Sequence, residues 1–310
     1  MFDYKVRRSN FYVLLVIITS LLLKYLLAPL LAKLHFSLEF YLVFPEILLF
    51  LITAIIYFVI TKESVIQTLR FKKISIVTVL IVIGIAILSQ PIAQLLSFIS
   101  QLVFPNTIAN LFQRLAEIPF IYKLIIIAGV PAICEEVFAR GIALKGYDDV
   151  DIKRASLMNG LIFGIMHLNG QQFLYAFALG TLFAYMVRIT GSIFTSMIAH
   201  FTVNGLQVLQ AEIALKVVDF MGEEYQNIQK LGVKGLPSST ILNMLIGLVI
   251  NAIICSGLIY LLLRVLKKKN RNYNENYEGK EIKVFDKPMK ILLGIFSISI
   301  LADLYFLYFK

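Results

Sequence analysis

Two adjacent carboxylates and an arginine interrupt an apolar segment near the middle of the chain. Glu135, Glu136 and Arg140 lie within residues 119–145, which are otherwise mostly apolar. Each charge at the centre of a membrane helix costs roughly 2.5–3.5 kcal/mol on insertion scales. Residues four apart share one helix face, so Arg140 is expected to pair with Glu136, while Glu135 points about 100° away. A structural ion pair accounts only for Glu136 and Arg140, so we predict a functional role for Glu135.

Two histidines follow in later apolar segments, each with another notable residue at helical spacing. Phe163 precedes His167 by four residues. Asn204 follows His200 at the same spacing. With a rise of about 1.5 Å per helical residue, Glu135, His167 and His200 lie roughly 14–18 Å from the expected cytoplasmic ends of their segments. This common depth predicts that three helices bring one carboxylate and two imidazoles together.

One carboxylate and two imidazoles form a set that can catalyse hydrolysis. Glu135 can act as a general base toward water. The two histidines can instead hold a divalent metal such as Zn²⁺, together with Glu135 or Glu136 and with one position open for water. Asn204 can donate a hydrogen bond to an oxyanion or orient His200. The zinc-protease motif HExxH and the serine-hydrolase motif GxSxG do not occur in the sequence.

The three motifs together resemble those of a known family, the CAAX protease and bacteriocin-processing (Abi) family. That family is marked by EExxxR, then FxxxH, then HxxxN or HxxxB, each on its own membrane span. The resemblance extends over about residues 119–205 and implies cleavage of a peptide bond within or near the membrane. It implies catalytic roles for Glu135, His167, His200 and Asn204, supported by Glu136 and Arg140.

The elements that must position these residues are expected to be membrane helices. Of the 310 residues, 59% are hydrophobic and only 15% are charged, whereas soluble domains carry about 25% charged residues. A span needs roughly 20 apolar residues. We predict an all-α transmembrane bundle of eight or nine spans, forming one domain over residues 1–310 with its catalytic core at residues 119–205. The apolar segments are residues 11–32, 40–60, 74–101, 119–145, 155–168, 171–188, 191–209, 240–263 and 290–309.

Basic residues near the segment ends predict the orientation and the partners. The net charge is +10, and most basic residues lie in short runs beside apolar segments, which indicates contact with anionic lipid rather than with nucleic acid. These runs predict a cytoplasmic N-terminus. The 210–237 loop, with Glu212, Glu223 and Glu224, is then expected outside. We expect a multi-pass protein of a bacterial plasma membrane, because the chain is rich in Ile and Lys and lacks Trp.

Two other functions also use intramembrane Glu and His residues. A proton-coupled transporter uses them as proton relays, but the inverted repeats common in transporters are not visible here. A non-proteolytic membrane regulator that binds a partner through its spans is the second alternative, and the complete motif set argues against it. The substrate of a protease, whether a peptide or a membrane protein, is not identified by the sequence, and neither is the oligomeric state.

Overall fold

Helices account for all nine of the apolar segments. The computed structural model of the protein describes residues 4–221, 233–271 and 282–309, and within these ranges the chain is helical and contains no strand. The predicted all-α class is therefore confirmed. The predicted count of eight or nine spans is not confirmed, because six helices in the described ranges are long and apolar enough to cross a membrane. These six are Tyr4–Leu31, Leu38–Thr61, Ile76–Gln101, Gly170–Thr190, Ser238–Lys269 and Lys287–Tyr308.

Short π-helical stretches interrupt the helices at four places, and two of them flank the helix that carries Glu135. Such stretches occur frequently at functional sites, because they break the regular register of a helix face. The π-helical stretches are Leu23–Leu27, Ile47–Ile52, Leu124–Gly129 and Val137–Ala143. The α-helices are α1 (Tyr4–Leu22), α2 (Ala28–Leu31), α3 (Leu38–Glu46), α4 (Thr53–Thr61), α5 (Val65–Thr68), α6 (Ile76–Gln101), α7 (Thr107–Arg114), α8 (Phe120–Lys123), α9 (Val130–Glu136), α10 (Ile152–Met166), α11 (Gly170–Thr190), α12 (Phe194–Met221), α14 (Ser238–Lys269) and α15 (Lys287–Phe309).

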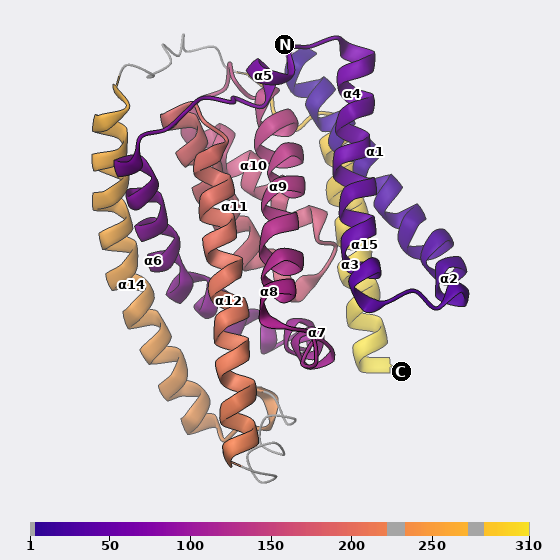
Figure 1. The fold of residues 1–310 in the computed structure, drawn as a ribbon, viewed down its shortest axis with the longest axis vertical. Helices are drawn as coiled ribbons and strands as arrows, with labels where there is room; N and C mark the ends of the chain where they lie inside the picture. Colours follow the sequence, from indigo (N-terminus) through magenta and orange to yellow (C-terminus); the bar gives the residue numbers. More distant parts are fainter. Residues whose placement is uncertain (1–3, 222–232, 272–281, 310) are drawn as a thin grey trace.

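The helices that carry the motifs lie at the centre of the bundle (Figure 1). α10 packs against α11, and α12 contacts both α9 and α11. α6 and α14 pair with each other on one side of this centre, and α1 and α15 pair on the other. The three motifs are therefore enclosed by helices from both ends of the chain.

Glycine residues allow α10 and α11 to approach closely. A Cβ on Gly160 would lie 2.1 Å from Thr181 Oγ1 and 2.6 Å from the Phe177 carbonyl oxygen. A Cβ on Gly180 would lie 2.9 Å from the Phe163 Cβ. Small residues at such crossings are typical of closely packed membrane helices. The crossing holds Phe163, and the helix end that follows it, in a fixed position.

A tight turn separates α10 from α11, so the fifth and sixth predicted segments are two helices rather than one. His167 is the C-cap of α10. Leu168 follows it in a left-handed conformation with φ of 46°. Asn169 caps α11, because its Oδ1 accepts from the Gln171 backbone N–H at 2.8 Å. The turn places His167 at the end of a helix, where its ring can face a space instead of a neighbouring turn.

The loop predicted over residues 210–237 is wrong in its first part. α12 continues to Met221, and Glu212 lies on this helix. The Glu212 carboxylate pairs with Lys123 at 2.9 Å, so a helix and not a loop carries this charge. Glu223 and Glu224 lie outside the described residues.

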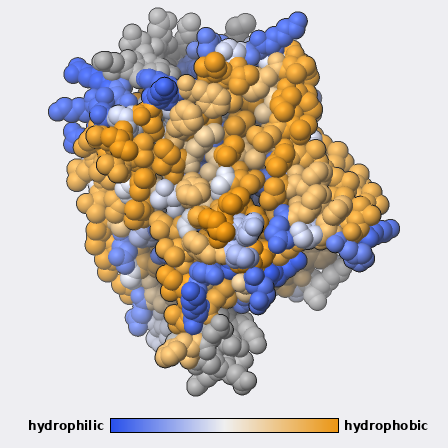
Figure 2. All heavy atoms as spheres, viewed as in Figure 1, coloured by the Kyte–Doolittle hydropathy of each residue, from blue (hydrophilic) through white to orange (hydrophobic). Residues whose placement is uncertain are grey.

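The exterior of the bundle is predominantly apolar, and hydrophilic residues gather toward its two ends (Figure 2). Large apolar side chains such as Ile60, Val59 and Ile253 are 74%, 70% and 67% exposed. This much exposed apolar surface is unfavourable for a monomer in water, but it is expected of a protein whose surface is in contact with lipid. The protein is thus an integral, multi-pass membrane protein. The N-terminus, α5 and the basic end of α14 all lie at one end of the bundle (Figure 1).

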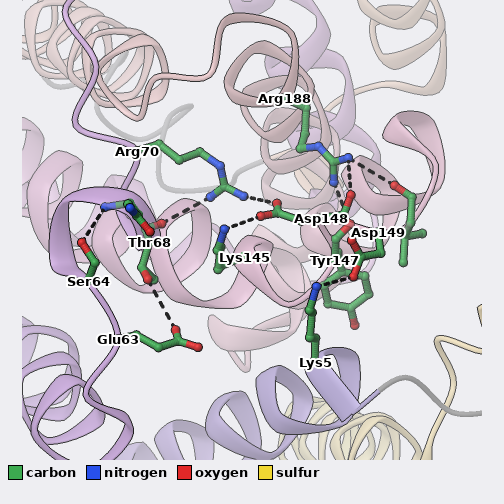
Figure 3. Close-up of polar contacts among 12 residues, drawn as sticks. Lys5, Glu63, Ser64, Thr68, Arg70, Lys145, Tyr147, Asp148, Asp149 and Arg188 are labelled. Carbon is green, nitrogen blue, oxygen red and sulfur yellow. Dashed lines mark hydrogen bonds and ion pairs between the residues drawn. The ribbon is translucent and has the colours of Figure 1, made fainter. Parts of the chain in front are cut away.

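Charged residues tie the loops together at the end of the bundle where the N-terminus lies (Figure 3). Arg70 donates from Nη1 to the Arg140 carbonyl oxygen at 2.8 Å and from Nη2 to the Asp148 carboxylate. Lys145 pairs with the other Asp148 oxygen at 2.7 Å. Arg188 donates to the Asp148 carbonyl oxygen at 3.0 Å. We refer to Arg70, Lys145, Asp148 and Arg188 as the loop-end network.

Candidate active site

Glu136 is held between two cationic or hydrogen-bonding groups at the centre of the bundle. Its Oε1 accepts from Arg140 Nη1 at 2.8 Å, which confirms the predicted pairing on one helix face. The same oxygen accepts from His200 Nδ1, also at 2.8 Å. Arg140 donates further, from Nη2 to the Gly180 carbonyl oxygen at 3.2 Å. Glu136 and Arg140 are fully buried. Their ion pair holds the His200 ring in place through its Nδ1 atom.

Glu135 points away from this ion pair, as the helical spacing predicted. Its Oε2 lies 3.9 Å from His200 Nε2, which is beyond hydrogen-bond distance. His200 thus has one carboxylate on each side: Glu136 bonded to Nδ1 and Glu135 near Nε2. Because the paired Glu136 carboxylate accepts, His200 Nδ1 carries the hydrogen, and in the neutral ring Nε2 is an acceptor.

His167 is fixed by its own helix. Its Nδ1 donates to the Phe163 carbonyl oxygen at 2.8 Å, which leaves Nε2 as the acceptor of the neutral ring. The Phe163 ring lies edge-on to both imidazoles, with centroids 5.3 Å from His167 and 5.9 Å from His200. The Arg140 guanidinium lies 4.0 Å from the centroid of the same ring. Phe163 therefore separates the ion pair from His167 and keeps the two histidines apart.

Asn204 lies one helical turn beyond His200 on α12. Its Nδ2 donates to the Ile127 carbonyl oxygen at 3.0 Å. Ile127 belongs to the π-helical stretch before α9, whose irregular hydrogen bonding leaves this carbonyl available. A side-chain amide has two N–H donors, so one donor of Asn204 remains. His200 Nδ1 donates to Glu136.

The predicted catalytic residues all line one cavity of about 410 Å³. Glu135, His167, His200 and Asn204 come from α9, α10 and α12 and face this space. Its volume falls in the range of about 300–1,000 Å³ that is usual for ligand sites. Glu136 and Arg140 lie behind the cavity wall and are not part of the lining. The structure thus brings together the residues that the three motifs separate in sequence.

One acidic residue in the cavity wall was missed by the sequence analysis. Glu46, at the end of α3, lines the same cavity as Glu135. A charged residue inside the apolar segment 40–60 was the available signal, because charges within spans are functional candidates. Glu46 has no partner at helical spacing that would complete a motif, since Leu42 and Phe50 are apolar. The cavity therefore contains two carboxylates instead of one.

No three-ligand zinc site is found among the described residues. His167 Nδ1 donates to the Phe163 carbonyl oxygen and His200 Nδ1 donates to Glu136, which leaves the Nε2 atom of each ring available as a ligand. Within the described ranges, no group of three or more His, Cys, Asp or Glu side chains is arranged to hold a metal ion. A catalytic zinc needs three protein ligands at close to 2 Å. The two histidines with Glu135 or Glu136 are not assembled in that way.

Comparison with known proteins bears on the segment that carries the motifs. Residues 117–206 match the family described as type II CAAX prenyl endopeptidase Rce1-like. The predicted resemblance is confirmed. The match covers nearly the same range as the predicted core at residues 119–205, and it supports intramembrane CAAX endopeptidase activity in general, because the Rce1-like family is a protease family. No curated protein and no solved structure matches the chain.

Proposed function

We propose that the chain is an intramembrane endopeptidase that hydrolyses a peptide bond of a membrane-embedded substrate inside the cavity. One observation carries this proposal: Glu135, His167, His200 and Asn204, which belong to three separate motifs, line a single cavity. The cavity is enclosed by an apolar bundle, so a substrate reaches it from within the membrane. The Rce1-like match over residues 117–206 agrees with this chemistry.

The first step is the activation of water by Glu135. The carboxylate takes one proton from the water, and the water oxygen attacks the carbonyl carbon of the scissile bond. His167 orients the water, because its Nε2 accepts the second water hydrogen while Nδ1 is held by the Phe163 carbonyl. The position of His167 at the end of α10 directs this acceptor into the cavity.

The second step is the collapse of the tetrahedral intermediate. The remaining N–H of Asn204 donates to the oxyanion, a contact that is stronger in the transition state than in the substrate. His200 Nε2, 3.9 Å from Glu135 Oε2, takes up the proton that Glu135 removed from the water and passes it to the leaving nitrogen, which restores the Glu135 carboxylate. The C–N bond then breaks to give an amine and a carboxylic acid, and the acid loses its remaining proton to the solvent on release. Glu136 keeps His200 in position throughout.

The orientation in the membrane follows the basic residues. We place the end of the bundle that carries the N-terminus, α5 and the basic end of α14 in the cytoplasm of a bacterial cell, because basic residues concentrate on the cytoplasmic side. Arg264, Lys267 and Lys268 at this end of α14 are exposed. They would contact anionic lipid headgroups of the inner leaflet.

The experiment that tests the proposal compares the peptides of membranes containing wild type or Glu135→Ala. Peptides whose formation requires Glu135 identify the substrate and the scissile bond. Glu117→Gln is the matched control, because Glu117 is an exposed carboxylate inside the same Rce1-like segment. The proposal expects the Glu117 variant to give the wild-type peptides and the Glu135 variant to lose them.

The same membranes separate the two alternative functions. A non-proteolytic regulator would keep its phenotype in Glu135→Ala and would show no peptide that depends on Glu135. A transporter would show proton-coupled flux in liposomes that contain the purified protein alone. Either result, in a variant that inserts and folds normally, would reject the proposed endopeptidase.

A further inference from the structure

Glu46 brings a second carboxylate to the cavity from outside the Rce1-like segment. It is the last residue of α3, directly before the π-helical stretch Ile47–Ile52, and Pro45 precedes it in the helix. α3 packs against α9, the helix that carries Glu135. Glu46 and Glu135 therefore face the same space from different helices.

Glu46 differs from three other carboxylates of the protein, because no cation of the described chain pairs with it. Glu136 has Arg140, Asp148 has Arg70, and Glu212 has Lys123. The Oε2 atom of Glu46 is shielded from solvent and has no hydrogen-bond partner among the described residues. A carboxylate removed from water without a partner is strongly destabilising. A retained residue of this kind within a membrane helix marks a binding or transport path.

The charge of the cavity wall indicates what kind of partner Glu46 accepts. The described residues of the lining include the two carboxylates, Glu46 and Glu135, but no lysine and no arginine. The cavity wall also contains uncharged polar residues, which do not neutralise the two carboxylates; these are Gln172, Tyr175 and Gln207. An anionic group is therefore disfavoured in this space, and a cationic group is favoured by both carboxylates.

We propose that Glu46 binds a positively charged group of the peptide substrate, an ammonium or a guanidinium, next to the scissile bond. The inference rests on the proposed endopeptidase function and adds a substrate class to it. The charged hydrogen bond that Glu46 lacks in the free protein is then made by the substrate. The substrate in turn buries a cation that lipid alone would exclude. The distance between the cation and the scissile bond therefore determines the single position in which the peptide binds in the cavity.

The test uses pairs of reporter peptides in proteoliposomes with the full-length protein. Their sequence is that of a substrate identified by the comparison of wild type with Glu135→Ala. One peptide of each pair has lysine at a position near the scissile bond, and the other has the uncharged norleucine there. Two further versions, one with a free and one with an acetylated N-terminus, distinguish a side-chain cation from an α-ammonium. Wild type is expected to cleave the cationic peptide with a kcat/KM about tenfold or more above that of its neutral partner.

Two variants of Glu46 and one control make the test specific. Glu46→Gln keeps the shape and should remove the preference by lowering kcat/KM for the cationic peptide only. Glu46→Lys should reverse it in favour of peptides with glutamate at the same position. Glu39→Gln is the matched control, because Glu39 lies on the same helix but does not line the cavity. It should keep the wild-type preference.

The outcomes separate this inference from the function on which it rests. If wild type cleaves the peptides and Glu46→Gln keeps the same preference, the cation-binding role of Glu46 is wrong while the endopeptidase stands. Equal cleavage of cationic and neutral peptides by wild type has the same meaning. If wild type cleaves no peptide at all, the proposed function is rejected and the inference with it. Loss of preference in Glu46→Gln with retained cleavage of the neutral peptide supports both.

Discussion

The cavity and the loop-end network both gather charged residues, but they differ in how those charges are partnered. In the loop-end network, Arg70, Asp148 and Arg188 all have partners within the protein. In the cavity, the Oε2 atom of Glu46 has no hydrogen-bond partner among the described residues, and Glu135 Oε2 lies 3.9 Å from His200 Nε2, beyond hydrogen-bond distance. Partnered charges stabilise a fold, whereas charges left open can interact with a substrate or a reacting atom. The difference predicts which substitutions change activity and which change stability.

The largest effect is expected from Glu135→Gln, and it should appear in activity alone. Loss of a general base typically lowers turnover by about 10²–10⁴-fold. The free energy of unfolding should change little, because Glu135 is not hydrogen-bonded to the described protein and the amide keeps its shape. Turnover of the reporter peptide and thermal unfolding in detergent measure the two quantities. Wild-type turnover in this variant would remove Glu135 from the catalytic residues.

Arg140→Ala is expected to affect stability and activity together. The Arg140 side chain pairs with Glu136 behind the cavity, and its carbonyl oxygen accepts from Arg70 of the loop-end network. The substitution removes the partner of buried Glu136 and should lower the free energy of unfolding by about 3–5 kcal/mol. Arg140→Lys should cost less, although an ammonium does not reach both Glu136 and the Gly180 carbonyl with the geometry of a guanidinium. Chemical unfolding in detergent gives the free energies, and peptide cleavage gives the activity.

A double substitution separates the two roles of this ion pair. Glu136→Gln with Arg140→Met replaces both charges by uncharged groups, and should recover much of the stability lost in Arg140→Ala. It should not recover activity, because His200 loses the carboxylate that holds its Nδ1. Recovery of both would mean that a neutral acceptor at position 136 positions His200 as well as the carboxylate does.

A smaller effect, on stability alone, is expected from Asp148→Asn in the loop-end network. Charged hydrogen bonds contribute about 1.5–3 kcal/mol each, so a loss of that order is expected. Asp149→Asn is the matched control: Asp149 pairs with Lys5 at 2.6 Å on the surface, and exposed pairs contribute about 0–1 kcal/mol. Equal losses in the two variants would contradict a special role for the network.

The pH dependence of stability gives an independent measure of the same network. Burial alone raises the pKa of Asp148, but Arg70 and Lys145 outweigh it and hold the pKa below its ordinary value. A carboxyl group of this kind stabilises the fold above its ordinary pKa of about 4. This contribution is lost as the pH falls through the lower pKa of the folded state. The Tm of wild type should therefore exceed that of Asp148→Asn near neutral pH, and the two should converge in acid.

The separation of interacting residues along the chain explains what the sequence could predict. The residues of the three motifs were predictable, because i to i+4 spacing on a helix makes partners such as Glu136 and Arg140 recognisable within a short stretch. Glu46 stood out as a charge within an apolar segment, but its place beside Glu135 was not predictable, because the residues that share its cavity lie on helices distant in sequence. The length of α12 was missed for a related reason: Glu212 resembled a loop residue, and its partner Lys123 is 89 residues away. The common depth of Glu135, His167 and His200 also predicted that three helices meet there, whereas individual contacts between helices, such as that of Glu212 with Lys123, were not predictable.

Metal removal is expected to have the smallest effect, and it tests whether the two cavity carboxylates are free of a bound metal ion. The described residues form no three-ligand set, so cleavage of the reporter peptide should survive an excess of a strong chelator. Elemental analysis of the active protein should find less than one metal ion per chain. Loss of activity on chelation, with recovery on added Zn²⁺ and loss of bound metal in His167→Ala, would contradict this. In that case Glu135 would have a cation partner after all, the contrast with the loop-end network would no longer hold, and Glu46 would face a bound ion instead of a substrate cation.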